Sequence, residues 1–245
     1  MTATKSESDI DKTVNQATEK AIKELLEKTR KVNRLLQSET SMEYAGISGV
    51  LSSVLESNVY ITNKQGKILG YALLDNFECD LMKDVVISNG EFPNHYANWL
   101  LKTEKTSANR RAKRGKCAYK ETEPCTMSGK YTTIVPIYGG GERMGTLILA
   151  KYNEEFTYSD LLLGEYGAAV VGMELLHDRT QRIAVDARKK ATVQIAMDTL
   201  SSSEKHAVVN IIGALGGTDG LLVTSNIAEL KDITRSVIVN ALRKL

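Results

Sequence analysis

The chain has 245 residues, of which 42% are hydrophobic and 25% charged, so it can bury a core and wholesale disorder is excluded. Its 32 lysines and arginines against 30 acidic residues leave a formal charge of +2, so any binding of an anionic partner must come from local clusters. No apolar run approaches the roughly 18 residues that span a bilayer, and the N-terminus is too polar for a signal peptide. We therefore predict a cytoplasmic protein without a membrane partner.

The N-terminal region is predicted to be a tail followed by helices. Residues 1–20 are polar and favour a mobile tail, so we place the start of the first domain at residue 21. Apolar side chains recur at helical spacing over 22–36 and again over 47–55. This periodicity predicts two helices, each with one apolar face.

The middle of the chain changes to the pattern of strands. β-branched and aromatic runs flank turns at 63–67 and 139–143, which predicts two antiparallel hairpins. Short helices are expected around 82–86 and 96–101, followed by a polar loop. Residues 21–156 are therefore predicted to form one α+β domain.

The last part of the chain is predicted to be helical, because residues 137–245 contain no proline. Thr157 followed by Asp160 is a capping-box pattern, which predicts one long helical linker over 157–200. A serine and a glutamate repeat this pattern at the start of 201–245. We expect that segment to be a separate helical module.

No catalytic or metal-binding grouping emerges from the sequence. The three cysteines and three histidines are scattered, without a spacing typical of zinc ligands or of a Cys-His catalytic pair. The run Gly139-Gly140-Gly141 would suit phosphate binding only before a helix, and here a strand pattern follows, which favours a hairpin turn. We predict a protein that is not an enzyme and has no catalytic residue, metal or cofactor.

Positive charge is concentrated in residues 102–120. Eight lysines and arginines face one glutamate there, which leaves a net charge of +7. Such a segment attracts phosphates, but a solvated, mobile loop explains it equally well. Both interpretations stay open.

The C-terminal helix pair carries the sharpest functional pattern. From Arg235 to Leu245 an apolar face lies opposite a face with Arg235, Ser236, Val239, Asn240 and Arg243. A DNA recognition helix needs this arrangement, because one face anchors the helix while the other reaches bases and phosphates. Ser225 or Thr224 is expected to cap the preceding short helix, and Ser225 is predicted to contact phosphate. The alternative is an ordinary helical hairpin with a polar exterior.

Five stretches of the sequence carry a family resemblance: residues 26–33, 66–71, 132–137 with the following Gly-Gly-Gly-Glu-Arg, 165–174 and 233–245. In this order they resemble the CodY family of transcriptional repressors of low-GC Gram-positive bacteria. The resemblance implies a GAF-type sensor domain with an antiparallel sheet, a long connecting helix and a winged helix-turn-helix. It also implies a homodimer or tetramer that binds double-stranded DNA operators and senses GTP and branched-chain amino acids. The tail over 1–20 has no family counterpart, and the chain is predicted to stop before the wing.

The same resemblance implies two effector sites. GTP contacts map onto Asn63, Lys64, Lys67, Tyr96, Glu174 and Arg179. Cations for phosphates, a ring for stacking and a carboxylate for guanine make chemical sense. Lysine replaces a family arginine at Lys64, so we expect weaker binding than in the family.

The amino-acid effector pocket maps onto Leu81, Met82, Phe92, Pro93 and Tyr119. Leu81 stands where the family has the arginine that binds the ligand carboxylate, so we predict loss of the usual branched-chain response unless Arg110 or Arg111 replaces it. The alternative to a DNA-binding regulator is a nucleotide-sensing or oligomerisation module on the same fold that does not bind DNA. Duplex binding separates the two.

Overall fold

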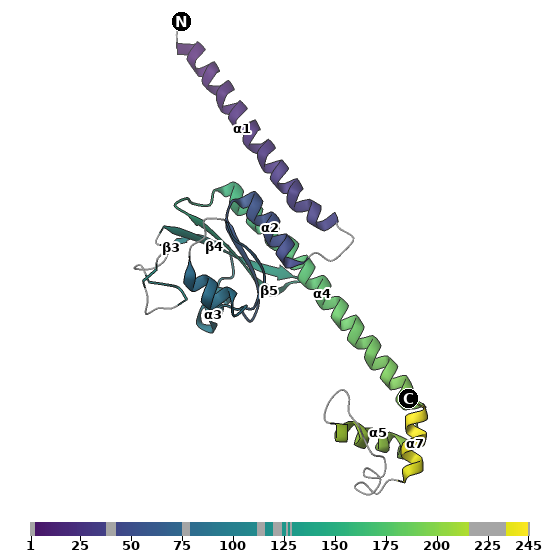
Figure 1. The fold of residues 1–245 in the computed structure, drawn as a ribbon. Helices are drawn as coiled ribbons and strands as arrows, with labels where there is room; N and C mark the ends of the chain where they lie inside the picture. Colours follow the sequence, from purple (N-terminus) through teal and green to yellow (C-terminus); the bar gives the residue numbers. More distant parts are fainter. Residues whose placement is uncertain are drawn as a thin grey trace. The chain divides into compact units, whose positions relative to one another are not determined.

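The computed structural model describes residues 3–37, 43–74, 79–111, 116–119, 124–125, 127, 129–215 and 234–244. It divides into two compact units, Met1–Asp178 and Arg179–Leu245 (Figure 1). The division falls inside the long helix α4 (Tyr158–Asp198) rather than at its ends. This helix is continuous over nearly all of the predicted linker.

The N-terminal segment is helical, which corrects the expected tail over 1–20. Helix α1 (Ala3–Asn33) begins near the start of the chain and continues into the 3-10 helix η1 (Arg34–Gln37). Residues 3–20 lack proline and glycine, so no strong helix breaker interrupts the backbone there. The side chains of residues 13–20 are exposed, so the polarity that predicted a tail reflects a helix without a buried face.

The first unit is built on a five-stranded antiparallel sheet of order β2-β1-β5-β4-β3. The strands are β1 (Asn58–Asn63), β2 (Ile68–Ala72), β3 (Ser107–Arg111), β4 (Lys130–Gly139) and β5 (Glu142–Tyr152). Both predicted hairpins are confirmed. Strand β3 was expected to be a loop, because its charged side chains suit only an edge strand and hide the strand pattern.

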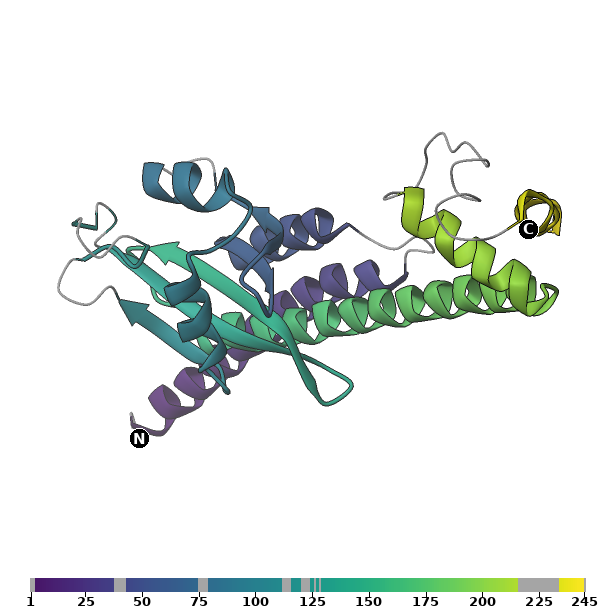
Figure 2. The same ribbon diagram turned by 90° about the horizontal axis from the view of Figure 1, so that it is seen from below.

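Alternating side chains give the sheet two cores, and helices lie against both of its faces (Figure 2). On one face Ile61 and Leu149 pack with helix α2 (Tyr44–Leu55) and the first turns of α4. On the other face their neighbours Tyr60 and Ile148 pack with the π-helix η2 (Met82–Ile87) and helix α3 (Asn94–Leu101). The period of two follows from strand geometry.

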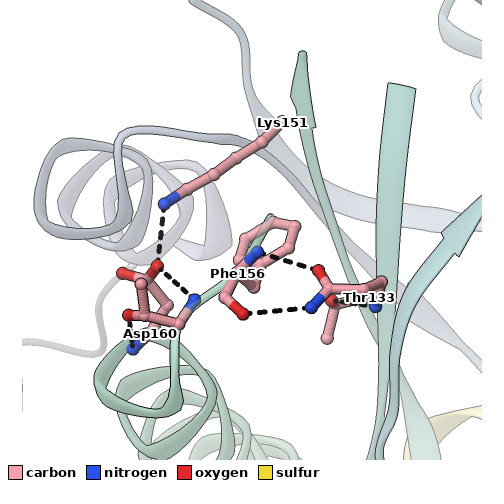
Figure 3. Close-up of polar contacts among 6 residues, drawn as sticks. Thr133, Lys151, Phe156 and Asp160 are labelled. Carbon is pink, nitrogen blue, oxygen red and sulfur yellow. Dashed lines mark hydrogen bonds and ion pairs between the residues drawn. The ribbon is translucent and has the colours of Figure 1, made fainter. Parts of the chain in front are cut away.

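The start of α4 is fixed by a polar cluster (Figure 3). The predicted capping box is confirmed: the Asp160 amide donates to Thr157 Oγ1 at 3.2 Å, and the Thr157 amide donates to Asp160 Oδ2 at 3.0 Å. Lys151 from β5 adds a buried ion pair with Asp160 at 2.9 Å. The Asn109 side chain accepts from the Phe156 amide and donates to its carbonyl, which ties β3 to the same point.

The second unit contains helices α5 (Ser202–Leu215) and α7 (Arg235–Lys244) after the end of α4. The second capping box is confirmed, since the Ser201 amide donates to Glu204 at 2.8 Å and the Glu204 amide donates back to Ser201. Ala241 of α7 packs against Val208 of α5. No helix among the described residues is long and apolar enough to cross a bilayer.

Candidate functional site

The turn of the first hairpin is a rigid loop that presents lysines. Asn63 Oδ1 accepts hydrogen bonds from the amides of Gln65 and Lys67 at 2.9 and 3.0 Å. Gly66 has φ +83° and lies so close to Ala97 of α3 that a Cβ would come within 2.5 Å of it. Asn63 therefore shapes the turn, while the Lys64 and Lys67 side chains remain exposed.

The second hairpin turn lies at the same end of the sheet, because Asn63 pairs with Gly145 across β1 and β5. Lys64 Nζ is 3.9 Å from a carboxylate oxygen of Glu142 on that turn. Helix α4 reaches the turn through the close backbone approach of Gly172 to Tyr138, two residues before Glu174.

Two of the GTP positions lie on α4. Glu174 Oε1 is buried and has no hydrogen-bond partner in the described part of the chain. Arg179 belongs to the second compact unit. Of the six residues predicted to contact GTP, Asn63, Lys64 and Lys67 thus lie on the first turn. Glu174 lies on the helix that packs at the same end of the sheet.

Tyr96 is not presented at this turn. Its ring is 8% exposed and lies 5.3 Å from the Phe92 ring and 5.2 Å from the Tyr119 ring, measured between centroids. Burial raises the pKa of the Tyr96 hydroxyl, so this group stays protonated. Helix α3 contacts the turn through Ala97, but the Tyr96 side chain lies in the aromatic cluster with Phe92 and Tyr119.

The residues predicted for the amino-acid pocket do gather in that cluster. Met82, Phe92 and Tyr119 are buried there, and Leu81 is half-buried against them. Pro93 is half-buried before α3 and accepts the Tyr96 amide hydrogen bond at 2.9 Å. Leu81 adds apolar surface and no charge to this cluster, as expected for a leucine.

A small pocket opens beside this cluster, with a volume of about 10 Å³. It is lined by Tyr60, Cys79, Met82, Tyr119, Lys130, Thr132, Ile148, Ala150 and Tyr152. Only Met82 and Tyr119 of these were predicted. The others lie mainly on β1, β4 and β5, where a pocket-facing side chain follows the same alternating pattern as a core side chain.

The predicted substitute cations are engaged elsewhere. The Arg110 guanidinium lies over the Trp99 ring at 4.7 Å from its centroid, and Arg111 lies over the Tyr131 ring at 4.4 Å. Arg110 also donates to Ser107 at 3.1 Å. These contacts hold both guanidinium groups on β3 and its neighbours.

Helix α7 separates an apolar face from a polar one. Ile238 and Ala241 are buried, and Val239 is half-buried. The polar positions Arg235, Ser236, Asn240 and Arg243 are all exposed. Ser225 lies outside the described residues. Among the residues that the structure describes, no group of three His, Cys, Asp or Glu side chains is arranged to hold a metal.

Comparison with known proteins places this architecture in a class. A family model described as the CodY GAF-like domain matches residues 24–199. The chain is 49% identical over 222 residues to the global transcriptional regulators CodY of Clostridium kluyveri and Clostridium perfringens, which covers 90% of this chain and 86% of each relative. The CodY protein of Clostridium botulinum is 47% identical over the same length.

Among solved structures, the cofactor-binding GAF domain of the nutrient sensor CodY from Clostridium difficile is 37% identical and has a TM-score of 0.47. The matched region covers 62% of this chain and 97% of the Clostridium difficile domain. The family match and the curated relatives define a transcriptional regulator with a GAF-like domain, not an enzyme. The chain belongs to the CodY family.

Proposed function

We propose that this regulator binds double-stranded DNA through α7 and changes its DNA affinity when effectors bind the first unit. The observation that carries the proposal is the division of α7 into a buried apolar face and an exposed face with Arg235, Ser236, Asn240 and Arg243. The buried face holds the helix on α5, so the polar face is free to enter a major groove.

Each polar position has a chemical role in this proposal. Asn240 reads a base edge, because its amide both donates and accepts in the pattern that adenine presents. Arg235 and Arg243 contact guanine or phosphate, and the half-buried Val239 contacts a thymine methyl group. Ser236 and Ser225 donate to phosphate oxygens and set the register of the helix.

GTP is the proposed nucleotide effector at the first hairpin turn. Lys64 and Lys67 meet the phosphates, and the Asn63 side chain keeps the turn in shape. The buried, unpartnered oxygen of Glu174 suits the adjacent N–H donors of guanine, which adenine lacks in that arrangement. Tyr96 takes no part, because its ring is buried in the aromatic cluster.

A homodimer or tetramer is the proposed DNA-binding species. Two copies read two half-sites and so match the symmetry of an operator. Exposed apolar side chains on the second half of α4, at Ile183, Val193 and Ile195, favour self-association. Light scattering of the purified chain tests this directly.

The DNA proposal is tested by selecting duplexes from a random library and measuring fluorescence anisotropy with the enriched sequence. We expect Arg235→Glu to abolish specific binding, since it places a negative charge against the duplex. Arg34→Glu makes the same charge change at an exposed position of η1 in the first unit and should bind like the wild type. Equal affinity of the two variants contradicts the assignment of α7. If no duplex is enriched while GTP still binds, the protein is a sensing module that does not bind DNA.

The GTP proposal is tested by calorimetry with GTP and ATP. The wild type should prefer GTP, and Glu174→Gln should lose most of that preference, because the charged acceptor of two guanine hydrogen bonds is gone. The expected loss is about 1.5–3 kcal/mol, which is a factor of roughly 10 to 150 in affinity. Glu165→Gln is the matched control, since Glu165 is exposed on the same helix. An equal preference in wild type and Glu174→Gln removes Glu174 from the site.

A further inference from the structure

The pocket beside the aromatic cluster contains a cation that the sequence does not single out. Among the described residues that line it, Lys130 alone carries a charge. Lys130 is the first residue of β4 and is half-buried. Its Nζ lies 5.3 Å from the centroid of the Tyr119 ring, so the ammonium group is directed over one wall of the pocket.

The ammonium group of Lys130 is available to a ligand. No carboxylate of a described residue forms an ion pair with it. The Lys130 ammonium lies 5.3 Å from the centroid of the Tyr119 ring. Arg110 and Arg111 lie closer to their rings, at 4.7 and 4.4 Å, and Arg110 also donates to Ser107. A half-buried cation beside apolar walls attracts an anion more strongly than an exposed lysine does, since water screens it less.

The other lining groups are neutral and fit a small amphiphilic acid. Burial raises the pKa of the Tyr60, Tyr119 and Tyr152 hydroxyls, so all three remain O–H donors at neutral pH. The Cys79 thiol is also held neutral by burial, which raises its pKa. Met82 and Ile148 supply apolar surface for a short aliphatic chain.

We propose that Lys130 binds the carboxylate of a small aliphatic carboxylic acid in this pocket and so supplies the positive charge that the neutral Leu81 cannot. The proposal rests on the proposed effector-sensing function and identifies the residue that decides which effector the pocket accepts. The ammonium group pairs with the carboxylate, and the tyrosine hydroxyls and Thr132 donate further hydrogen bonds to it. The aliphatic chain lies against Met82 and Ile148.

Ligand binding must also enlarge the pocket. Its volume of about 10 Å³ is of the order that holds one water molecule. An aliphatic acid therefore has to displace parts of the walls. Tyr119 and Met82 of η2 belong to these walls, so the ligand reshapes the face of the sheet on which the aromatic cluster lies.

The test uses calorimetry on the full chain with three probes: isoleucine, its 2-oxo acid 3-methyl-2-oxopentanoate, and isoleucinamide, which lacks the carboxylate. We expect the wild type to bind one or both acids and not the amide. Lys130→Gln should weaken acid binding by roughly ten- to a hundredfold, as expected for loss of a charge-assisted hydrogen bond. Lys130→Arg should retain binding because it keeps the charge. Lys116→Gln, an exposed and matched charge change, should bind like the wild type.

Two results overturn the proposal: neither acid binds the wild type, or Lys130→Gln binds the acids as tightly as the wild type. GTP and duplex binding are measured on the same samples. If both persist in Lys130→Gln, the variant is folded and the regulator function stands apart from the pocket. If the wild type binds no duplex, the proposed DNA-binding function fails, while the acid titrations still decide the role of Lys130.

Discussion

Replacing Asp160 with asparagine should destabilise the first unit strongly. Asp160 and Lys151 are only 6% and 7% exposed, and their side chains are 2.9 Å apart. Asparagine keeps an oxygen that accepts the hydrogen bond from the Thr157 amide, which Asp160 accepts at 3.0 Å in the wild type. However, the substitution leaves the Lys151 ammonium buried without its counter-ion. Breaking a buried ion pair by removing one partner costs about 3–5 kcal/mol.

The pH dependence of this effect has a definite sign. Burial alone would raise the pKa of Asp160, but hydrogen bonds from Lys151 and Thr157 outweigh it and hold the pKa below its ordinary value. A lowered pKa in the folded state means that the pair stabilises the protein above the unfolded pKa of about 3.9. This stabilisation is lost as the pH falls through the lowered value. The difference between wild type and Asp160→Asn should therefore shrink in acid.

Denaturant unfolding followed by tryptophan fluorescence measures the effect, because the single tryptophan, Trp99, lies on α3 in the first unit. Lys151→Met and the double variant complete a double-mutant cycle. We expect the double variant to be more stable than the sum of the single losses predicts, because neither charge is then left alone. A loss below about 1 kcal/mol for Asp160→Asn, the range of an exposed pair, refutes the reasoning.

Two further predictions concern the sheet and the second unit. Gly145→Ala should lower the free energy of unfolding by about 1–3 kcal/mol, because its Cβ would lie 1.9 Å from the Thr62 carbonyl oxygen; the control Gly49→Ala has open space in α2 and should be neutral or stabilising. NMR of the Glu204 side-chain carboxyl carbon should show a titration near pH 2, since the hydrogen bond from Lys244 lowers the pKa of Glu204 to about 2. The contact stabilises above the ordinary pKa of about 4.3 and is lost as the pH falls toward 2. A titration at the ordinary value contradicts it.

Local patterns predicted much of the fold because their causes are local. Both capping boxes are visible in sequence, since the two residues of each box satisfy one another's amides. The hairpins follow from alternation and glycine turns. The helical start of α1 was missed because a polar composition indicates that a segment is exposed and does not show whether its backbone is helical. The first part of α1 is an exposed helix and therefore has the composition of a tail.

The pocket was predicted only in part, because its walls come from distant segments. Lys130 is the first residue of β4 and has no motif around it, and only the fold brings it over Tyr119. The surroundings of Tyr96 could not be read from the sequence for a similar reason. Its neighbour Ala97 contacts the first turn, whereas its own ring points into the aromatic cluster.

Effector binding to the first unit is proposed to change the DNA affinity of this regulator. The most direct measurement is anisotropy of the selected duplex with and without GTP at a concentration that calorimetry shows to be saturating. We predict a change in affinity of at least about fivefold, in the range of ordinary allosteric coupling. We also predict that Lys64→Ala, which removes a proposed phosphate contact, reduces this change at the same GTP concentration. Identical DNA affinity of the wild type with and without bound GTP would show that the two sites are not coupled.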